Sequence, residues 1–263
     1  MKRTALVTGA SSGIGKATAA ALAARGYQVI GTSRRPSDHA ADGVEFVELD
    51  LASPESVEAL APVLAGVDVL VNNAGESHSG PFEELPADDL HRLFQVNVLG
   101  PVRLTQLVLP GMRERGYGRV VMVGSMLASF PLSYRSSYVA SKAALRGFAS
   151  GARHEYSPFG VWLTTVEPGS INTGISERRT RYTVPGSPHR ADFERMLAAL
   201  DRNEGSGTPA TRVAATIVKA IEAARPRQRY AVGSRAPLSF AARRLLPAET
   251  IEKLTHRQHG LSR

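Results

Sequence analysis

The sequence predicts an α/β fold, a doubly wound parallel sheet of about seven strands with helices on both faces. Short apolar runs alternate with longer segments of helical composition, and several of these runs are continuous, as in strands buried on both faces. No linker rich in Pro, Gly and Ser divides the chain of 263 residues. We therefore expect a single domain over residues 1–263.

The expected elements follow one another in a regular order. Apolar runs predict strands at residues 4–8, 27–33, 44–50, 67–75, 118–126, 161–169 and 229–233. Segments of helical composition predict helices at residues 16–26, 53–66, 85–116, 136–160 and 211–224. Ser53 is a candidate N-cap and Gly26 a candidate C-cap, because these residue types favour those positions.

The turn between the first strand and the first helix reads TGASSGIG, residues 8–15. Its glycines let the backbone turn tightly and approach a phosphate, while helix N–H groups point at the anion. The strand, glycines and helix come in the order that a Rossmann-type dinucleotide site requires; a tight turn without a ligand is the alternative. We expect the cofactor to contact Gly9, Ser11, Ser12, Gly13, Ile14 and Gly15.

The end of the second expected strand bears on cofactor choice. An NAD site usually places Asp or Glu there, whereas this chain has Arg34 and Arg35. A guanidinium can bind a 2′-phosphate through two parallel hydrogen bonds. The sequence therefore favours NADP(H) over NAD(H), with two solvated surface arginines as the alternative. Asp38, which could serve the ribose, is expected beyond the strand end.

Further motifs make the chain similar to the short-chain dehydrogenase/reductase family. The resemblance is strong over residues 2–173 and resumes near residues 208–233. Gly124 departs from it where many members carry a second serine, and residues 76–78 are polar where many relatives are apolar. The motifs, in chain order, are the glycine turn, Asp50-Leu51, NNAG at residues 72–75, Asn97, Ser125, YVASK at residues 138–142 and PGSINT at residues 168–173.

The resemblance implies cofactor contacts beyond the glycine turn. Asp50 and Leu51 correspond to the family's adenine contacts, and Ile171 and Thr173 to its nicotinamide carboxamide contacts. The remaining residues in this set are Asn73, Ala74, Gly75, Tyr138, Lys142, Pro168 and Gly169.

Tyr138 and Lys142 lie one turn apart on the same face of an expected helix. A free tyrosine has a pKa near 10, and a nearby cation favours the phenolate. We therefore predict that Lys142 lowers the pKa of Tyr138 until the phenol can exchange a proton near neutral pH. Taken alone, Tyr138 could equally be an amphipathic core residue.

The resemblance also implies roles for the catalytic residues Asn97, Ser125, Tyr138 and Lys142. Tyr138 acts as the general acid or base, and Ser125 hydrogen-bonds the substrate oxygen. Lys142 also binds the nicotinamide ribose, and Asn97 holds a water that links Lys142 to solvent. The hydride belongs to the cofactor.

Composition excludes several other classes. The absence of cysteine excludes disulfides and thiolate catalysis, and the seven histidines are scattered, so we expect no metal site. The net charge is +8, but the arginines are dispersed, and we expect no nucleic-acid partner. The sequence shows neither an apolar run of about 18 residues nor a signal peptide. We therefore expect a cytoplasmic protein with no integral membrane segment.

Substrate selectivity is expected beyond the carboxyl ends of the strands. A substrate lid at about residues 174–207 carries Arg178, Arg179, Arg181 and Arg190. These arginines suggest an acidic, phosphate-bearing or carrier-bound substrate, with a solvated surface as the alternative. The basic tail, about residues 234–263, is expected to pack on its own domain. Contact with a membrane surface or a partner subunit is the alternative for the tail.

These features predict an NADP(H)-dependent oxidoreductase that interconverts a secondary alcohol and a ketone, or an alcohol and an aldehyde. Relatives grouped near hydroxysteroid and retinol dehydrogenases suggest a lipophilic small-molecule substrate, and the family usually forms homodimers or homotetramers. Two alternatives are an NADP(H)-binding sensor without turnover and a non-redox enzyme such as an epimerase or dehalogenase. The intact set of Ser125, Tyr138 and Lys142 argues against both.

Overall fold

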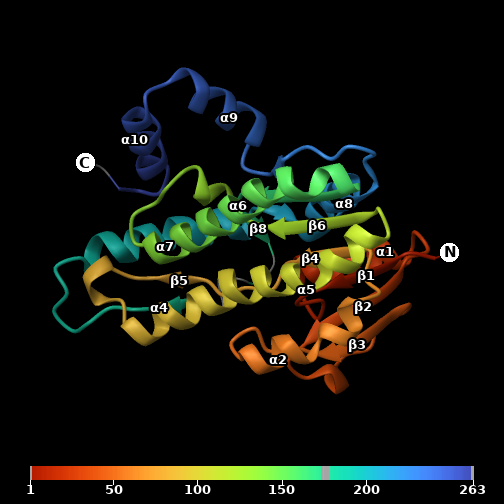
Figure 1. Ribbon diagram of the computed structural model, residues 1–263. Coiled ribbons are helices and arrows are strands. Elements are labelled where there is room, and N and C mark those ends of the chain that lie inside the picture. The colour runs from red at the N-terminus through yellow and green to blue at the C-terminus, as the bar shows by residue number, and fades with distance from the viewer. Residues whose placement is uncertain (1, 173, 175–177, 262–263) are drawn as a thin grey trace.

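A parallel sheet of seven strands forms the centre of the computed structural model, which describes residues 2–172, 174 and 178–261 (Figure 1). The strand order is β11-β7-β6-β4-β1-β2-β3, and every neighbouring pair is parallel. The order reverses between β1 and β4, which confirms the predicted doubly wound sheet. The strands are β1 (Thr4–Val7), β2 (Gln28–Ser33), β3 (Val44–Glu48), β4 (Val69–Asn72), β6 (Gly118–Val123), β7 (Val161–Pro168) and β11 (Arg229–Val232).

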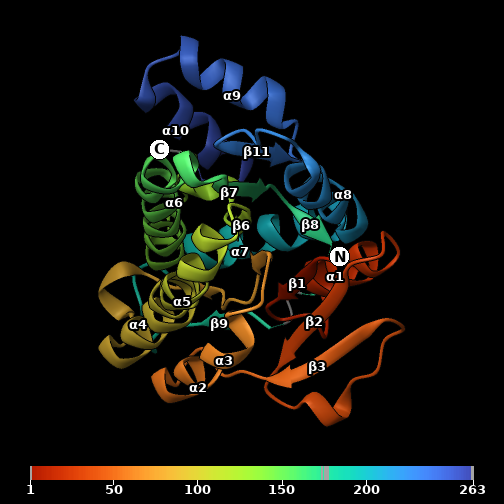
Figure 2. The same cartoon turned by 45° about the vertical axis from the view of Figure 1, so that its right-hand side comes forward.

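Helices cover both faces of this sheet (Figure 2). One face carries α1 (Gly13–Ala23) and α8 (Ala210–Glu222), which pack against each other. The opposite face carries α2 (Pro54–Ala59), α3 (Ala61–Leu64), α5 (Gly100–Glu114) and α6 (Ser136–Tyr156).

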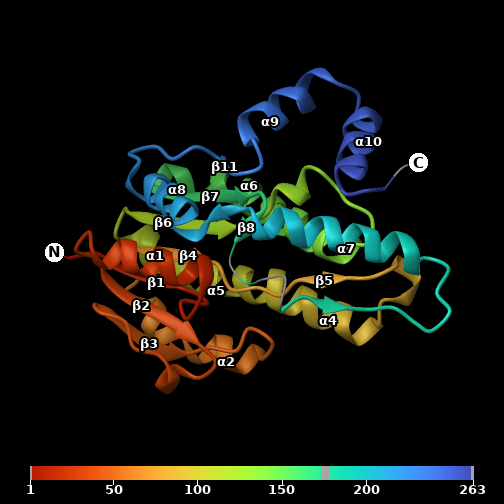
Figure 3. The same ribbon diagram turned by 180° about the vertical axis from the view of Figure 1, so that it is seen from behind.

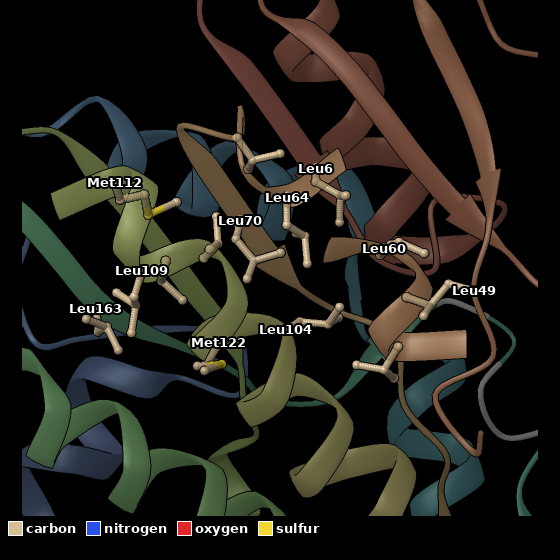
Figure 4. Close-up of a cluster of buried hydrophobic side chains, with 14 of the residues drawn as sticks. Leu6, Leu49, Leu60, Leu64, Leu70, Leu104, Leu109, Met112, Met122 and Leu163 are labelled. Atoms are coloured by element: carbon tan, nitrogen blue, oxygen red, sulfur yellow. The ribbon is translucent and has the colours of Figure 1, made fainter. Parts of the chain in front are cut away.

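Alternate side chains of each strand enter the two cores, because successive residues of a strand point to opposite faces. In β1, Leu6 joins the core beneath α5, whereas Ala5 and Val7 join the core beneath α1 and α8. Figure 4 shows the first of these cores, where Leu6 and Leu70 of the sheet lie among leucines and Met112 of the covering helices. The continuous apolar runs in the sequence therefore reflect strands buried on both faces.

Two expected helices are interrupted in the structure. The segment 53–66 divides at Leu60 into α2 and α3, and the Ser53 hydroxyl accepts a hydrogen bond from Ser56 N at 3.1 Å, which confirms the predicted N-cap. The segment 85–116 contains α4 (Ala87–Phe94), a π-helical turn (Gln95–Leu99) and α5. The π-helical turn widens the helix where it carries Asn97.

The lid region pairs with the loop after β4. Its described part holds β9 (Thr180–Arg181), which is parallel to β5 (His78–Ser79), and the helix α7 (Arg190–Gly205). A second short pair joins β8 (Ile171–Asn172) to β10 (Thr208–Pro209). Figure 3 shows α7 running along the rear of the molecule, beside β5 and below the C-terminal helices.

The C-terminal tail forms α9 (Ala236–Leu245) and α10 (Ala248–Gln258), which stand above the rest of the fold in Figure 1. Phe240 of α9 contacts Phe130 edge to face, and Leu261 joins a small core with Phe193 and Met196 of α7. The tail thus packs on its own chain at both ends. Within the described part of the chain, none of the helices has the length and apolar composition that a membrane crossing requires.

Candidate active site

A cleft of about 1250 Å³ opens at the carboxyl ends of β1, β2, β4, β6 and β7. This edge of a doubly wound sheet is where the strand order reverses and where ligands bind. The structure brings most of the predicted site residues to the walls of the cleft. They are Gly9, Ser11, Ser12, Gly13, Ile14, Arg34, Arg35, Asp50, Leu51, Asn73, Ala74, Gly75, Ser125, Tyr138, Lys142, Pro168, Gly169 and Ile171.

Two other predicted residues, Gly15 and Asn97, do not line the walls of the cleft. Gly15 is in the first turn of α1, behind the glycine turn, and Asn97 is buried beneath the cleft. Thr173 lies outside the described residues. The described part of the chain offers no group of His, Asp and Glu arranged to hold a metal ion.

The glycine turn has the backbone that its sequence predicts. Gly9 and Gly13 have φ values of +66° and +54°, in the left-handed region that glycine adopts without strain. A Cβ on Gly15 would lie 2.2 Å from the carbonyl oxygen of Gly9. Gly15 therefore lets α1 approach the turn closely instead of touching a ligand itself.

Thr8 joins the glycine turn to the NNAG segment. Its hydroxyl accepts hydrogen bonds from Asn73 N and Ala74 N, both at 2.9 Å, and Asn73 Nδ2 donates to Thr8 O at 2.9 Å. These bonds fix the floor of the cleft between β1 and β4. The turn and NNAG segments, which are far apart in the sequence, thus form one rigid surface.

Arg34 and Arg35 follow β2 and are exposed on the cleft wall. Asp38, expected beyond the strand end, lies at the end of the short 3-10 turn Pro36–Asp38, and it also faces the cleft. The rim therefore carries two guanidiniums and one carboxylate. A 2′-phosphate would be attracted by both arginines and repelled by Asp38.

Tyr138 and Lys142 are both buried on α6, and Ser125 follows β6. Lys142 Nζ donates to Val123 O at 3.0 Å and lies 5.8 Å from the centroid of the Tyr138 ring. Burial lowers the pKa of Lys142 to about 8. The three residues of the expected catalytic set that face the cleft therefore come together around one point of its wall.

The predicted lowering of the Tyr138 pKa by Lys142 is wrong for the structure as it stands. Burial raises the pKa of Tyr138, and the opposing effects come first from the charge of Arg135 and then from a hydrogen bond with Ser125. The spacing of the two residues indicates a nearby cation but not their burial, and desolvation disfavours the charged phenolate.

Asn97 ties the loop after β4 to α6. Its Oδ1 accepts from Glu76 N at 2.8 Å, and its Nδ2 donates to Glu76 O at 3.0 Å and to Ser141 Oγ at 3.1 Å. A Cβ on Gly75 would lie 2.9 Å from Asn97 Oδ1 and 3.5 Å from Lys142 Nζ. Asn97 and Lys142 thus both approach the position that a side chain at residue 75 would occupy.

Arg135 is a site residue that the sequence analysis missed. It is buried, and its guanidinium carbon lies 4.3 Å from the centroid of the Tyr138 ring. The guanidinium donates to Ser77 Oγ at 3.0 Å, His78 O at 2.7 Å and Ser79 Oγ at 2.8 Å. The polar residues after NNAG were the available signal, because these are the groups that bind Arg135.

The lid arginines are paired with the lid's own acids. Arg179 lies 2.6 Å from Asp201 and 2.5 Å from Glu204, and Arg181 lies 3.2 Å from Asp201. Arg190 lies 3.7 Å from Glu194. These contacts engage three of the four arginines that were considered for an anionic substrate. Arg181 and Arg190 are exposed, as the solvated-surface alternative expects, whereas Arg179 is buried.

The part of the cleft beyond Tyr138 has mixed walls. Apolar side chains come from the loop after β6, from α7 and from α10: Met126, Leu127, Phe130, Leu200, Ile251 and Leu254. Polar groups, among them Glu204, Thr255 and His259, interrupt these walls. A substrate bound here would contact apolar surface on more than one side.

The chain belongs to the short chain dehydrogenase family, which matches residues 3–182. It is 32% identical over 96% of its length to an uncharacterized oxidoreductase of Bacillus subtilis, covering 97% of that protein. It is 31% identical to the 3-ketodihydrosphingosine reductase of Bacteroides thetaiotaomicron, over 90% of both chains. It is accordingly an enzyme that acts on CH–OH or keto groups.

Solved structures agree with this assignment. A short-chain dehydrogenase from Streptomyces avermitilis superposes with a TM-score of 0.83 at 33% identity, covering 98% of this chain and 97% of its own. A short-chain dehydrogenase from Sphingobium yanoikuyae in complex with NADPH has a TM-score of 0.73 at 27% identity, with coverages of 92% and 90%.

Proposed function

We propose that this enzyme uses NADP(H) to interconvert a secondary alcohol and a ketone, or an alcohol and an aldehyde. The observation that carries the proposal is the meeting of Ser125, Tyr138 and Lys142 in the same cleft as the glycine turn. A sensor without turnover would have no need for this set.

The cleft fits a dinucleotide. Gly9 and Gly13 carry no side chain at two bends of the turn, and the N-terminus of α1 supplies N–H groups for a pyrophosphate. Asp50 and Leu51 would border the adenine, and Arg34 and Arg35 the 2′-phosphate. The Sphingobium yanoikuyae structure contains NADPH, and a serine dehydrogenase that is 25% identical contains NADP+ with a TM-score of 0.74. These neighbours support the nicotinamide cofactor and are consistent with the phosphate-bearing form.

When bound, the nicotinamide would supply or accept the hydride. In the direction of reduction, Ser125 would donate a hydrogen bond to the carbonyl oxygen and stabilise its developing charge. Tyr138 would then transfer its phenolic proton to that oxygen, and in oxidation it would take the proton back. Lys142 would hold the ribose and pass a proton to the phenolate, with Asn97 supporting the connection to solvent.

A lipophilic substrate is the class that we propose. Apolar side chains line several parts of the walls beyond Tyr138. Curated relatives include a 3-ketodihydrosphingosine reductase and the bovine retinol dehydrogenase 8, 32% identical over 95% of this chain. Both names describe compounds with long apolar chains. Because Arg179 and Arg181 are neutralised by lid acids, a carrier-bound anionic substrate is less favoured.

The test is NADPH consumption with a panel of ketones and aldehydes graded by chain length. Tyr138→Phe should abolish turnover while NADPH still binds. Tyr156→Phe, at the end of the same helix, serves as the matched control and should retain activity. Tight NADPH binding without turnover on any carbonyl would favour the sensor, and turnover that survives Tyr138→Phe would overturn the proposed role of this tyrosine.

A further inference from the structure

Arg135 is a buried cation on the wall of the cleft. Its side chain is 3% exposed, and its hydrogen bonds go to two hydroxyls and one carbonyl oxygen. Its Nε has no hydrogen-bond partner. Among the ion pairs of the described residues, none includes Arg135. Burying a charge that has no ionic partner makes folding less favourable. Such a residue is therefore a candidate for a role in the site.

The guanidinium faces the ring of Tyr138. A distance of 4.3 Å from its carbon to the ring centroid places the charge over the aromatic face. Arg135 precedes α6 and Tyr138 lies in its first turn, so both are held by the same short stretch of backbone. Ser77, His78 and Ser79 hold the guanidinium from the other side. Its position is therefore fixed before any substrate binds.

Charged and titratable groups reach Tyr138 from every side. Arg135 and Lys142 belong to the α6 region, and Ser125 follows β6. From the lid side, Glu204 of α7 favours the neutral phenol, while Arg179 favours the phenolate. Glu204 is itself paired with Arg179 at 2.5 Å, so these two effects largely offset each other. Of the cations around Tyr138, Arg135 has the largest effect in favour of the phenolate, and the charges of Glu204 and Asp201 act on Arg135 itself.

We propose that Arg135 is a positioning residue that acts through Tyr138, its buried guanidinium stabilising the phenolate during proton transfer. This inference rests on the proposed proton-transfer role of Tyr138. In reduction the phenolic O–H bond breaks as the O–H bond of the product alcohol forms. The negative charge left on the Tyr138 oxygen lies beside Arg135 until a proton from solvent replaces the one transferred.

The first test compares Arg135→Met with Arg135→Lys in alcohol oxidation with NADP+. In this direction kcat/KM rises with pH as Tyr138 loses its proton. With a neutral residue at position 135, the midpoint of this rise should move upward by about one to three pH units. Arg135→Lys keeps the charge and should return the midpoint toward that of the wild type. Equal midpoints in the wild type and Arg135→Met would overturn the inference.

The second test uses a change with the opposite sign. Glu204→Gln removes a negative charge that opposes the phenolate, so the same midpoint should move downward. A general loosening of the site would not move the pH midpoints of these two variants in opposite directions. A downward shift, or no shift, in Arg135→Met together with any shift in Glu204→Gln would contradict a specific role for the guanidinium.

A measurement without turnover separates this inference from the proposed function. Phenolate absorbance of each protein is titrated with pH, and the curve of the matching variant that also carries Tyr138→Phe is subtracted. The difference reports Tyr138 alone and should shift upward in Arg135→Met. If Tyr138→Phe keeps full activity, the proposed function fails even where this titration behaves as expected. An unshifted titration would refute the role of Arg135 alone.

Discussion

Arg178 of the lid donates from Nη1 to the hydroxyl of Ser12, 3.0 Å away, and thereby bridges the lid to the glycine turn. Ser12 is the N-cap residue of α1, but its side chain does not cap the helix. The first N–H groups of α1 are thus left for another acceptor, and a guanidinium lies beside them. Both features favour an anion at this position.

Arg178→Ala should therefore weaken NADPH binding by about fivefold, or ~1 kcal/mol, because a partly exposed cation near a phosphate contributes at this level. Titration of NADPH fluorescence at low and at high salt measures the effect, which should shrink with salt. Arg202→Ala is the control, since Arg202 is exposed on α7 and does not line the cleft. Equal affinities for the wild type and Arg178→Ala would contradict a phosphate contact.

Replacing both Arg34 and Arg35 by alanine should remove the preference for NADPH over NADH that we propose. Loss of charge-assisted contacts to the 2′-phosphate should raise the KM for NADPH by about tenfold to a hundredfold and leave that for NADH nearly unchanged. Arg25→Ala is the matched control. Arg25 pairs with Glu222 of α8 at 3.1 Å, and neither residue lines the cleft. If both cofactors weaken equally, the two arginines do not read the phosphate, and Asp38 would be the next residue to test.

Lys142 should make the folding stability depend on pH above neutrality. Burial lowers its pKa to about 8 from the usual 10.5, so between these values the unfolded chain binds more protons than the folded one. The free energy of unfolding should accordingly rise with pH above about 8, by at most about 1.4 kcal/mol per pH unit from this group. Urea unfolding from pH 7 to 9.5 should show a smaller rise in Lys142→Met than in the wild type. Parallel curves would mean that the lysine is not desolvated.

Gly75→Ala should reduce kcat strongly and lower the free energy of unfolding by about 1–3 kcal/mol, because the new methyl group enters a packed space. It would lie 2.9 Å from Asn97 Oδ1 and 3.5 Å from Lys142 Nζ, and must displace one of them. Gly66→Ala is the control, since no atom lies within 4 Å of a Cβ at that position. Steady-state kinetics and urea unfolding of both variants measure the two effects. A fully active Gly75→Ala would show that residue 75 has room for a methyl group.

Much of the fold follows from patterns within single segments. The buried runs of β1, β4 and β6 and the glycines at positions 9 and 13 carry their structural meaning locally, and each was predicted in its place. The fold class followed from the alternation of these segments, because few arrangements bury both faces of an apolar strand.

The electrostatics around Tyr138 could not be predicted in the same way. Arg135 and Lys142 are near Tyr138 in sequence, but which cation faces the ring depends on Ser77, His78 and Ser79, which approach from another part of the chain. The pairing of Arg179 with Asp201 and Glu204 likewise depends on how β9 meets α7. Such contacts arise from tertiary packing and leave no periodic signal in the sequence.

Helix α10 contributes Ile251 and Leu254 to the wall of the cleft beyond Tyr138. In the order of the chain, α10 comes after all the strands of the central sheet. None of the predicted cofactor contacts comes from α9 or α10. Residues 236–261 therefore contribute to the substrate side of the cleft and to none of the predicted cofactor contacts. Exchanging them with the matching segment of a relative should change which carbonyl compounds are accepted and leave cofactor affinity in place.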